Sequence, residues 1–311
     1  MQQSFAKSFL QSKRLKSKLK QLILCITLSI PLLLSAQQKG IKHIILIGVD
    51  GLGANYLSKA TNIPVIQSII TNGATTMHAR CVSPSSSAVN WASMVMGAGP
   101  ELHGFTEWDS KKPEIPSRVT DHYGLFPTVY ALLRDQKPDS KIGVIYSWGG
   151  IGYLFPKKAV NKDDYTGNDS LTADHAAAYI QNDKPNFLFV HFDGVDGAGH
   201  GIGWGTKDYY DAIQRTDKYI GQILASIKKA GIEENTVVIV TADHGGIKTS
   251  HGGKSIQEME IPWIAIGRNV KKSTDLNQSI MTYDTAATIA WLFGLKVPQV
   301  WIGRPITSAF K

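Results

Sequence analysis

The sequence predicts an α/β fold with a mostly parallel central sheet and helices on both faces. Apolar runs of strand length recur at 41–49, 141–148, 186–192, 235–242 and 261–267. Uninterrupted apolarity is typical of strands that are buried on both faces, as in a parallel sheet covered by helices. Helix-like segments alternate with these runs, at 63–71, 87–96, 127–135, 171–181, 208–230 and 283–293. This alternation predicts one α/β domain over residues 37–311, with surface loops at 109–125 and 149–170.

Residues 1–36 have the pattern of a secretory signal peptide. The first 20 residues contain six basic side chains and no acidic one, and an apolar run from Leu22 to Leu34 follows, which closes at Ala36. A membrane-spanning helix needs about 20 apolar residues, so this run favours cleavage near Ala36 over retention as an anchor. Lipidation at Cys25 is a further alternative. We therefore expect an exported protein, periplasmic or extracellular, with no stable membrane anchor after cleavage.

The charge balance argues against a nucleic-acid polymer as a partner. The whole chain has 33 basic and 25 acidic residues, a formal net charge of +8. Loss of the leader would leave 27 basic residues against 25 acidic ones, and no long basic stripe remains. Cys81 would be the single remaining cysteine, so no internal disulfide is expected. These features suit a small-molecule substrate and leave the oligomeric state open.

Acidic residues and histidines follow three of the predicted strands. They are Asp50, Asp193 with Asp196, and Asp243 with His244. Ligands of open α/β sheets bind beyond the carboxyl ends of the strands. These side chains are therefore expected to converge on one site.

Glycines allow neighbouring side chains here to reach one ion. Adjacent residues of a strand point to opposite faces, so Asp243 and His244 can share a metal only where the strand breaks, and two following glycines provide that break. Asp196 and His200 lie four residues apart around two glycines and can likewise reach one ion. Carboxylate oxygens combined with imidazole nitrogens favour Zn²⁺ or another borderline divalent cation over Ca²⁺.

Each of these residues taken alone also has an ordinary interpretation. Asp50 can be a simple strand exit, and an isolated Asp-His-Gly is usually a turn. His251 can be a solvated loop residue, and His191, inside a predicted strand, can be a core histidine or a group that supports a ligand. The convergence of all these residues on one sheet edge favours a two-metal site.

Six segments carry a family resemblance: GVDGLG, SPSSSAVNWASMVMG, ELHGF, VDGAGH, TADHGG and HGGKSIQEMEIPWIAIG. In this order they resemble the alkaline phosphatase superfamily, in particular its type I phosphodiesterase/nucleotide pyrophosphatase branch, from residue 41 to about 306. The resemblance implies an alkaline-phosphatase-like fold with two Zn²⁺ ions. One ion would be held by Asp196, His200 and His251. The other would be held by Asp50, Asp243 and His244, with Ser87 directed toward it.

The resemblance also implies a serine nucleophile. Family members place it three residues after a proline and three before an asparagine, and here Pro84 and Asn90 frame Ser87, with Ser86 as the fallback. By composition alone, a serine at this position is a helix N-cap. The two roles are compatible, because a helix N-terminus also favours a bound phosphate. The phosphoryl group would pass first to Ser87 and then to water.

Related activities differ from this chain at identifiable positions. Sulfatases of the superfamily have Pro and Arg two and four residues after the nucleophile, where this chain has Val89 and Trp91. Phosphomonoesterases often have a Lys and Arg clamp, where the loop YSWGGIGY has Trp148 and Gly150. The first difference argues against a sulfatase, and the second weakens the monoesterase interpretation.

The diesterase pattern also differs at one position. Its members place a phosphate-binding Asn five residues after the motif His103, where this chain has Trp108. The oxygen contact can come instead from backbone N–H groups, Lys254 or Asn90. Trp108 and Trp148 are candidates for stacking on a leaving group, although aromatic residues are more often part of the core.

The sequence therefore predicts an exported two-zinc phosphoester hydrolase that favours diesters or pyrophosphate bonds and acts through a phosphoseryl intermediate. A phosphomonoesterase or phosphotransferase of the same superfamily is the alternative. A non-catalytic metal-binding protein is a remote alternative, against which the complete set of six ligands and the framed serine argue. The short interval between His244 and His251 predicts a compact site with little covering.

Overall fold

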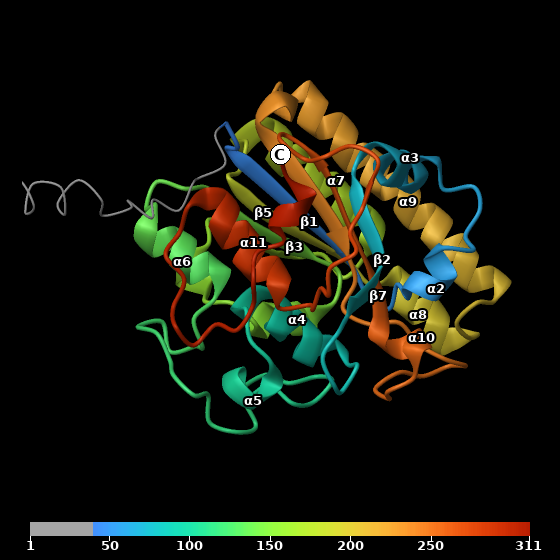
Figure 1. Cartoon of the computed structure of the whole chain (residues 1–311), viewed down its shortest axis with the longest axis horizontal. Helices are drawn as coiled ribbons and strands as arrows, with labels where there is room; N and C mark the ends of the chain where they lie inside the picture. Colours follow the sequence, from blue (N-terminus) through green and yellow to red (C-terminus); the bar gives the residue numbers. More distant parts are fainter. Residues whose placement is uncertain (1–39) are drawn as a thin grey trace, which may run out of the picture. The chain divides into compact units, whose positions relative to one another are not determined.

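A central eight-stranded sheet organises residues 40–311, the part of the chain that this computed structural model describes (Figure 1). The strand order is β4-β3-β5-β1-β6-β7-β2-β8. The strands are β1 His43–Val49, β2 Ala74–Arg80, β3 Ile142–Tyr146, β4 Lys162–Tyr165, β5 Phe187–Phe192, β6 Thr236–Thr241, β7 Glu260–Gly267 and β8 Thr274–Asp275. The predicted signal peptide lies outside the described residues.

The sheet is mostly parallel, as the apolar runs predict. The five consecutive strands from β4 to β6 run in the same direction. Within this group, Ile47 of β1 pairs with Val190 of β5 on one side and with Val240 of β6 on the other. Every residue of β1 is buried, which explains why its sequence is apolar without alternation. The exception among the predicted strands is β7, which runs antiparallel to both β6 and β2.

Three strands lack the apolar run that reveals the others. β2 mixes polar and apolar residues, β4 reads KDDY, and β8 has two residues. Edge strands such as β4 can be polar because one side of the ladder stays unpaired. The expectation of a surface loop over 149–170 is therefore wrong in part, since this segment contains β4 and the 3₁₀ turns η1 (Gly149–Tyr153) and η2 (Lys157–Ala159).

Helices cover both faces of the sheet, as predicted (Figure 1). α3, α7 and α9 pack on one face, and α4, α6 and α11 pack together on the other. The helices are α2 Ala54–Leu57, α3 Pro64–Asn72, α4 Ser87–Met96, α5 Pro100–His103, α6 Val129–Gln136, α7 Asp169–Asp183, α8 Gly194–Gly201, α9 Lys207–Lys229, α10 Ile256–Met259 and α11 Asp284–Phe293. Among the described helices, none combines the length and apolarity that a membrane crossing requires.

Local sequence sets where the main helices begin and end. The Thr206 hydroxyl accepts the Tyr209 N–H at the start of α9, and Asn168 caps α7 in the same way. α4 ends at Gly97, whose φ of 61° is left-handed and costs glycine no strain. At its other end, α4 begins with Ser87, close to the carboxyl ends of the parallel strands. The fold thereby brings a helix N-terminus to the sheet edge that carries the acidic residues.

Candidate active site

The carboxyl ends of β1, β5 and β6 lie side by side. The registers of β1 with both neighbours bring the three strands to an end at the same level. The backbone N–H of Asp50 donates to Phe192 O over 2.8 Å, which ties the end of β1 to the end of β5. The predicted ligands that follow these ends are Asp50, Asp196, Asp243 and His244.

Asp50, Asp243 and His244 form a buried group, in which each residue is at most 1% exposed. His244 Nε2 lies 3.4 Å from Asp50 Oδ1 and 3.2 Å from Asp243 Oδ2. Backbone N–H groups of Gly51 and His244 donate to the other oxygen of Asp243. Those two bonds hold the carboxylate so that Oδ2 faces the imidazole.

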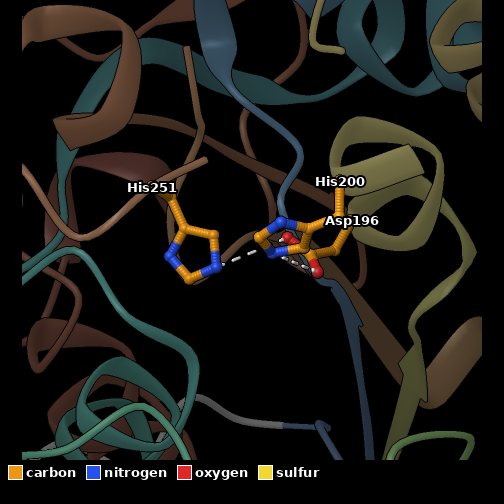
Figure 2. A group of neighbouring side chains, drawn as sticks. All are labelled: Asp196, His200 and His251. Carbon is orange, nitrogen blue, oxygen red and sulfur yellow. Dashed lines mark ion pairs between the residues drawn. The ribbon is translucent and has the colours of Figure 1, made fainter. Parts of the chain in front are cut away.

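Asp196, His200 and His251 form a second, more open group (Figure 2). Asp196 and His200 both lie on α8, and His251 comes from the loop before α10. Asp196 Oδ2 is 3.4 Å from His200 Nε2, and Asp196 Oδ1 is 3.8 Å from His251 Nε2. The two groups adjoin, because Asp50, Asp196 and His244 offer ligand atoms within 4.8 Å of one another. The rings of His244 and His251 also stack, with centroids 3.8 Å apart.

The three histidines share one orientation. The Nδ1 atoms of His200, His244 and His251 each lie 2.8–3.0 Å from a backbone carbonyl oxygen, of Thr249, Gly245 and Ser85 respectively. A carbonyl can only accept, so Nδ1 carries the proton and the neutral ring presents the Nε2 lone pair to the carboxylates. Where the carboxylates are ionised, lone pairs therefore face lone pairs in this cluster, and a bound cation would stabilise that arrangement.

Two unpartnered carboxylate oxygens support the same conclusion. Asp196 Oδ1 and Asp243 Oδ2 are buried and have no hydrogen-bond donor. Buried polar atoms are nearly always satisfied, and both oxygens point at imidazole nitrogens that carry no proton. The residues present therefore fit divalent cations with mixed oxygen and nitrogen ligands, a donor set that suits Zn²⁺. The carbonyl bonds at Nδ1 are the usual way in which a protein orients such histidine ligands.

Burial and mutual repulsion perturb the pKa values of these groups. Burial, followed by the charges of Asp50 and Asp193, raises the pKa of Asp196 to about 9. Burial also raises the pKa of Asp243 well above its ordinary value, with Asp50 and Asp196 adding to the effect. Burial, together with the neighbouring His251, lowers the pKa of His244 to about 3. The raised carboxyl pKa values reflect negative charge that a bound cation would offset, and the lowered pKa of His244 favours the neutral ring that can bind a cation.

Ser87 is placed beside the buried group. Its Oγ lies 3.1 Å from His244 Nε2 and 3.4 Å from Asp50 Oδ1. Ser87 is the first residue of α4, and the fallback Ser86 occupies the N-cap position without a side-chain capping bond. The hydroxyl of Ser87 is therefore available to a ligand at the N-terminus of a helix, where unpaired N–H groups favour anions.

Asn90 has a different place from the substrate contact that its sequence position suggested. Its amide nitrogen lies within hydrogen-bond distance of the carbonyls of Val82, Pro84 and Ser86, and its oxygen accepts the Val82 N–H. The side chain is fully buried. Because its donors are already engaged, Asn90 holds the loop before α4 in shape rather than facing the ligand groups.

The other expected substrate contacts, Trp108, Trp148 and Lys254, differ in exposure and position. Trp108 is 59% exposed, and its carbonyl accepts the Ala88 N–H at the start of α4. Trp148 lies closer, with its ring centroid 6.4 Å from that of His191. Lys254 is exposed on the loop that follows His251.

Three residues support the ligand groups in the structure, and one of them, His191, has the supporting role that the sequence left as an alternative. His191 and Trp91 both donate to Asp50 Oδ2. Ser85 joins the serine loop to the His251 loop, since its hydroxyl donates to Gly253 O and accepts the Gly252 N–H. One signal in the sequence points to Trp91, because it lies four residues after Ser87 on a predicted helix and hence on the same helix face.

The chain is similar to a known protein family and to several named relatives. The protein family described as "Type I phosphodiesterase / nucleotide pyrophosphatase" matches this chain over residues 44–261. Bis(5'-adenosyl)-triphosphatase enpp4 of Xenopus laevis is 24% identical over 227 residues, which are 67% of this chain and 48% of the relative. GPI ethanolamine phosphate transferase 1 of Saccharomyces cerevisiae is 23% identical over 303 residues, 85% of this chain and 33% of the relative. The chain thus spans half or less of the length of these relatives.

A solved structure supports the assignment of the fold. The structure of wild-type alkaline phosphatase PafA superposes on this chain with a TM-score of 0.70 at 13% identity. The match covers 87% of this chain and 99% of the PafA chain. At this identity the likeness concerns the fold alone, and it confirms the expected alkaline-phosphatase-like architecture. Because the family match covers well over half of its length, this chain belongs to the type I phosphodiesterase/nucleotide pyrophosphatase family.

Proposed function

We propose that this protein is an exported two-zinc phosphoester hydrolase that favours diesters or pyrophosphate bonds and acts through a phosphoseryl intermediate. The observation that carries the proposal is the position of Ser87 Oγ, 3.1 Å from His244 Nε2 and 3.4 Å from Asp50 Oδ1, at the edge of a cluster of lone pairs. A serine hydroxyl beside a cation site and at a helix N-terminus is suited to attack phosphorus.

The two groups of ligands would each hold one Zn²⁺. One ion would lie among Asp196, His200 and His251, and the other among Asp50, Asp243 and His244. When bound, the ions would supply positive charge to the attacking and leaving oxygens and to the phosphoryl group. Three protein ligands for each ion leave room for substrate.

Two displacements would complete the reaction. In the first, a bond forms between Ser87 Oγ and phosphorus, the bond from phosphorus to the leaving-group oxygen breaks, and the serine proton passes through solvent to the leaving group. In the second, a water oxygen attacks the phosphorus on Ser87, the bond from phosphorus to Ser87 Oγ breaks, and a proton from the water restores the hydroxyl. The product keeps the ester that remained on phosphorus. The N–H groups at the start of α4 favour the negative charge of the phosphoryl group in both steps.

The diester or pyrophosphate preference draws on a relative and on one missing feature. The relative from Xenopus laevis is named as a hydrolase of a dinucleoside triphosphate, whose scissile bonds are pyrophosphate bonds. The Lys and Arg clamp common in phosphomonoesterases is replaced by Trp148 and Gly150. Both points favour a substrate that carries an esterified phosphate.

A phosphotransferase is the second candidate. The relative from Saccharomyces cerevisiae, named as an ethanolamine phosphate transferase, matches 85% of this chain. The same phosphoseryl group would then pass to an alcohol instead of water. Added alcohol acceptors should in that case raise the rate at which the phosphoserine is consumed.

A substrate panel on one zinc-loaded preparation tests the proposal. We expect turnover of bis(p-nitrophenyl) phosphate and diadenosine triphosphate to exceed turnover of p-nitrophenyl phosphate, and p-nitrophenyl sulfate to be inert. Ser87→Ala should abolish turnover while zinc remains bound, whereas Ser86→Ala should retain it. Mass spectrometry of acid-quenched enzyme should find on Ser87 the phosphoryl group with its remaining ester, a p-nitrophenyl phosphoryl group when the model diester is the substrate. Undiminished turnover by Ser87→Ala would refute the mechanism.

Export is tested separately. Expression of the full chain in a Gram-negative host, followed by fractionation, should yield protein outside the cytoplasm whose N-terminus lies at Gln37. Full-length protein retained in the cytoplasm would contradict this part of the proposal without affecting the chemistry.

A further inference from the structure

We propose that Trp91 and His191 are positioning residues that hold one oxygen of Asp50, so that only its other oxygen is presented to the metal and to Ser87. The inference rests on the proposed function, since it concerns how that site is set up. It assigns a role to two fully buried side chains that lie outside the ligand set.

Two N–H donors converge on one oxygen atom. Trp91 Nε1 lies 2.9 Å from Asp50 Oδ2, and His191 Nε2 lies 3.1 Å from the same atom. The other oxygen, Oδ1, lies 3.4 Å from both Ser87 Oγ and His244 Nε2. The two oxygens of the Asp50 carboxylate therefore have different roles. Oδ2 is held by the protein, and Oδ1 is directed toward the site.

Trp91 also couples this carboxylate to the helix that carries the nucleophile. Ser87 and Trp91 lie four residues apart on α4, so they share one helix face, and both contact Asp50. Room for the indole depends on Gly48 of β1, where an added Cβ would lie 2.5 Å from the Trp91 ring. The indole thus fixes the distance between the start of α4 and the end of β1.

His191 braces the arrangement from the neighbouring strand. Its ring meets the Trp91 ring edge to face, with centroids 5.0 Å apart. A carboxylate oxygen can only accept, so Nε2 carries the proton, and a neutral ring then has no lone pair on Nε2 for a metal. Since His191 belongs to β5 and Asp50 follows β1, this bond adds a side-chain link to the backbone ladder between the two strands.

Fixing one oxygen has two chemical consequences. It favours binding of the metal through Oδ1 alone, which leaves a coordination position open for substrate. It also prevents the carboxylate from rotating away from Ser87. Outer partners of metal ligands are commonly worth about 10- to 100-fold in metal affinity or activity.

Zinc affinity measured on the full chain, by competition with a chromophoric chelator, tests the inference without relying on turnover. Trp91→Phe and His191→Leu should each weaken one of two bound ions about 10- to 100-fold and leave the other unchanged. His191→Gln, which keeps an N–H donor, should restore affinity to within a few-fold of the wild type. In turnover assays kcat should fall more than KM rises. If Trp91→Phe fails to fold, the His191→Leu and His191→Gln pair carries the test.

Matched controls separate positioning from general damage to the core. Trp301→Phe loses a buried indole bond to Pro127 O, and His103→Leu loses a buried imidazole bond to Ser93 on α4. Both should lower the melting temperature and leave zinc affinity unchanged. Equal loss of affinity in these controls would overturn the inference.

The outcomes also distinguish this inference from the proposed function. If Asp50→Asn loses one ion while Trp91→Phe and His191→Leu bind two ions normally, the positioning role is wrong and the metal site stands. If the wild-type chain binds no zinc, the proposed function fails as well. Three bound ions, with one lost in His191→Leu, would instead make His191 a ligand together with Asp50 and Asp193, and would overturn the inference.

Discussion

The two groups of metal ligands are held in different ways. Asp243 and His244 lie at the end of a central strand with fully buried side chains, whereas the His200 side chain is 47% exposed on the short helix α8. The end of a central parallel strand is fixed by hydrogen bonds to neighbours on both sides, while a short helix and a loop can shift. We call the buried group, which lies beside Ser87, the rigid half of the candidate site, and the more exposed group with His200 the adaptable half.

The largest expected effect on turnover comes from a substitution in the rigid half. Asp243→Asn removes a charged ligand and should lower kcat/KM by about 100- to 1,000-fold or more. The metal-free variant should fold at least as stably as the wild type, because burial already raises the pKa of Asp243 and favours its neutral form. Turnover and thermal melting after chelation check both parts. Wild-type turnover in this variant would show that the buried group is not a metal site.

The adaptable half should release its metal first. We expect a zinc-loaded sample mixed with a colorimetric chelator to lose two ions in separate phases, the faster one from Asp196, His200 and His251. His200→Ala should accelerate the fast phase about 10-fold or more and leave the slow phase unchanged. A single phase for both ions would contradict the difference in exposure that separates the two halves.

The stability of the metal-free protein should fall as pH rises from 7 to 9. The pKa of Asp196 rises from 3.8 to about 9 on folding, so the folded state binds a proton that the unfolded state has lost, and this stabilisation is lost as pH approaches 9. The lowered pKa of His244, about 3, acts only below its ordinary value of 6.5 and does not enter this window. Melting curves in chelator should show the slope. Asp196→Asn should make the slope shallower but leave part of it, because burial also raises the pKa of Asp243. An unchanged slope in that variant would refute the assignment.

The smallest expected effect concerns the link between the two loops. Ser85→Ala removes two hydrogen bonds, to Gly253 O and from Gly252 N–H, and should destabilise the protein by about 1 kcal/mol. Ser86→Ala is the matched control, since the side chain of Ser86 makes no capping bond, and its effect should stay within about 0.5 kcal/mol. Urea unfolding of both variants measures the difference. Equal effects would remove the special role of Ser85.

The local pattern of apolar residues was sufficient to predict most of the strands of the sheet. The apolar runs predict β1, β3, β5, β6 and β7, because strands buried on both faces must be apolar throughout. β4 escapes the same reasoning, since an edge strand of sequence KDDY needs no apolar face. The same reasoning does not predict that β7 is antiparallel, because the residues of one strand do not show in which direction its neighbours run.

At the candidate site, too, local sequence predicts some features and tertiary structure determines the others. By itself the sequence determined which residues follow the strand ends, and the glycines beside Asp243 and Asp196 that let neighbouring side chains turn together, because both are properties of adjacent residues. Only the tertiary structure decided that His191 and Trp91 share one oxygen of Asp50, that Asn90 serves its own loop, and that Ser87 rather than Ser86 faces His244. Most of these contacts join residues far apart along the chain. They depend on strand register and helix placement, which arise from packing of the whole domain and leave no trace in local sequence.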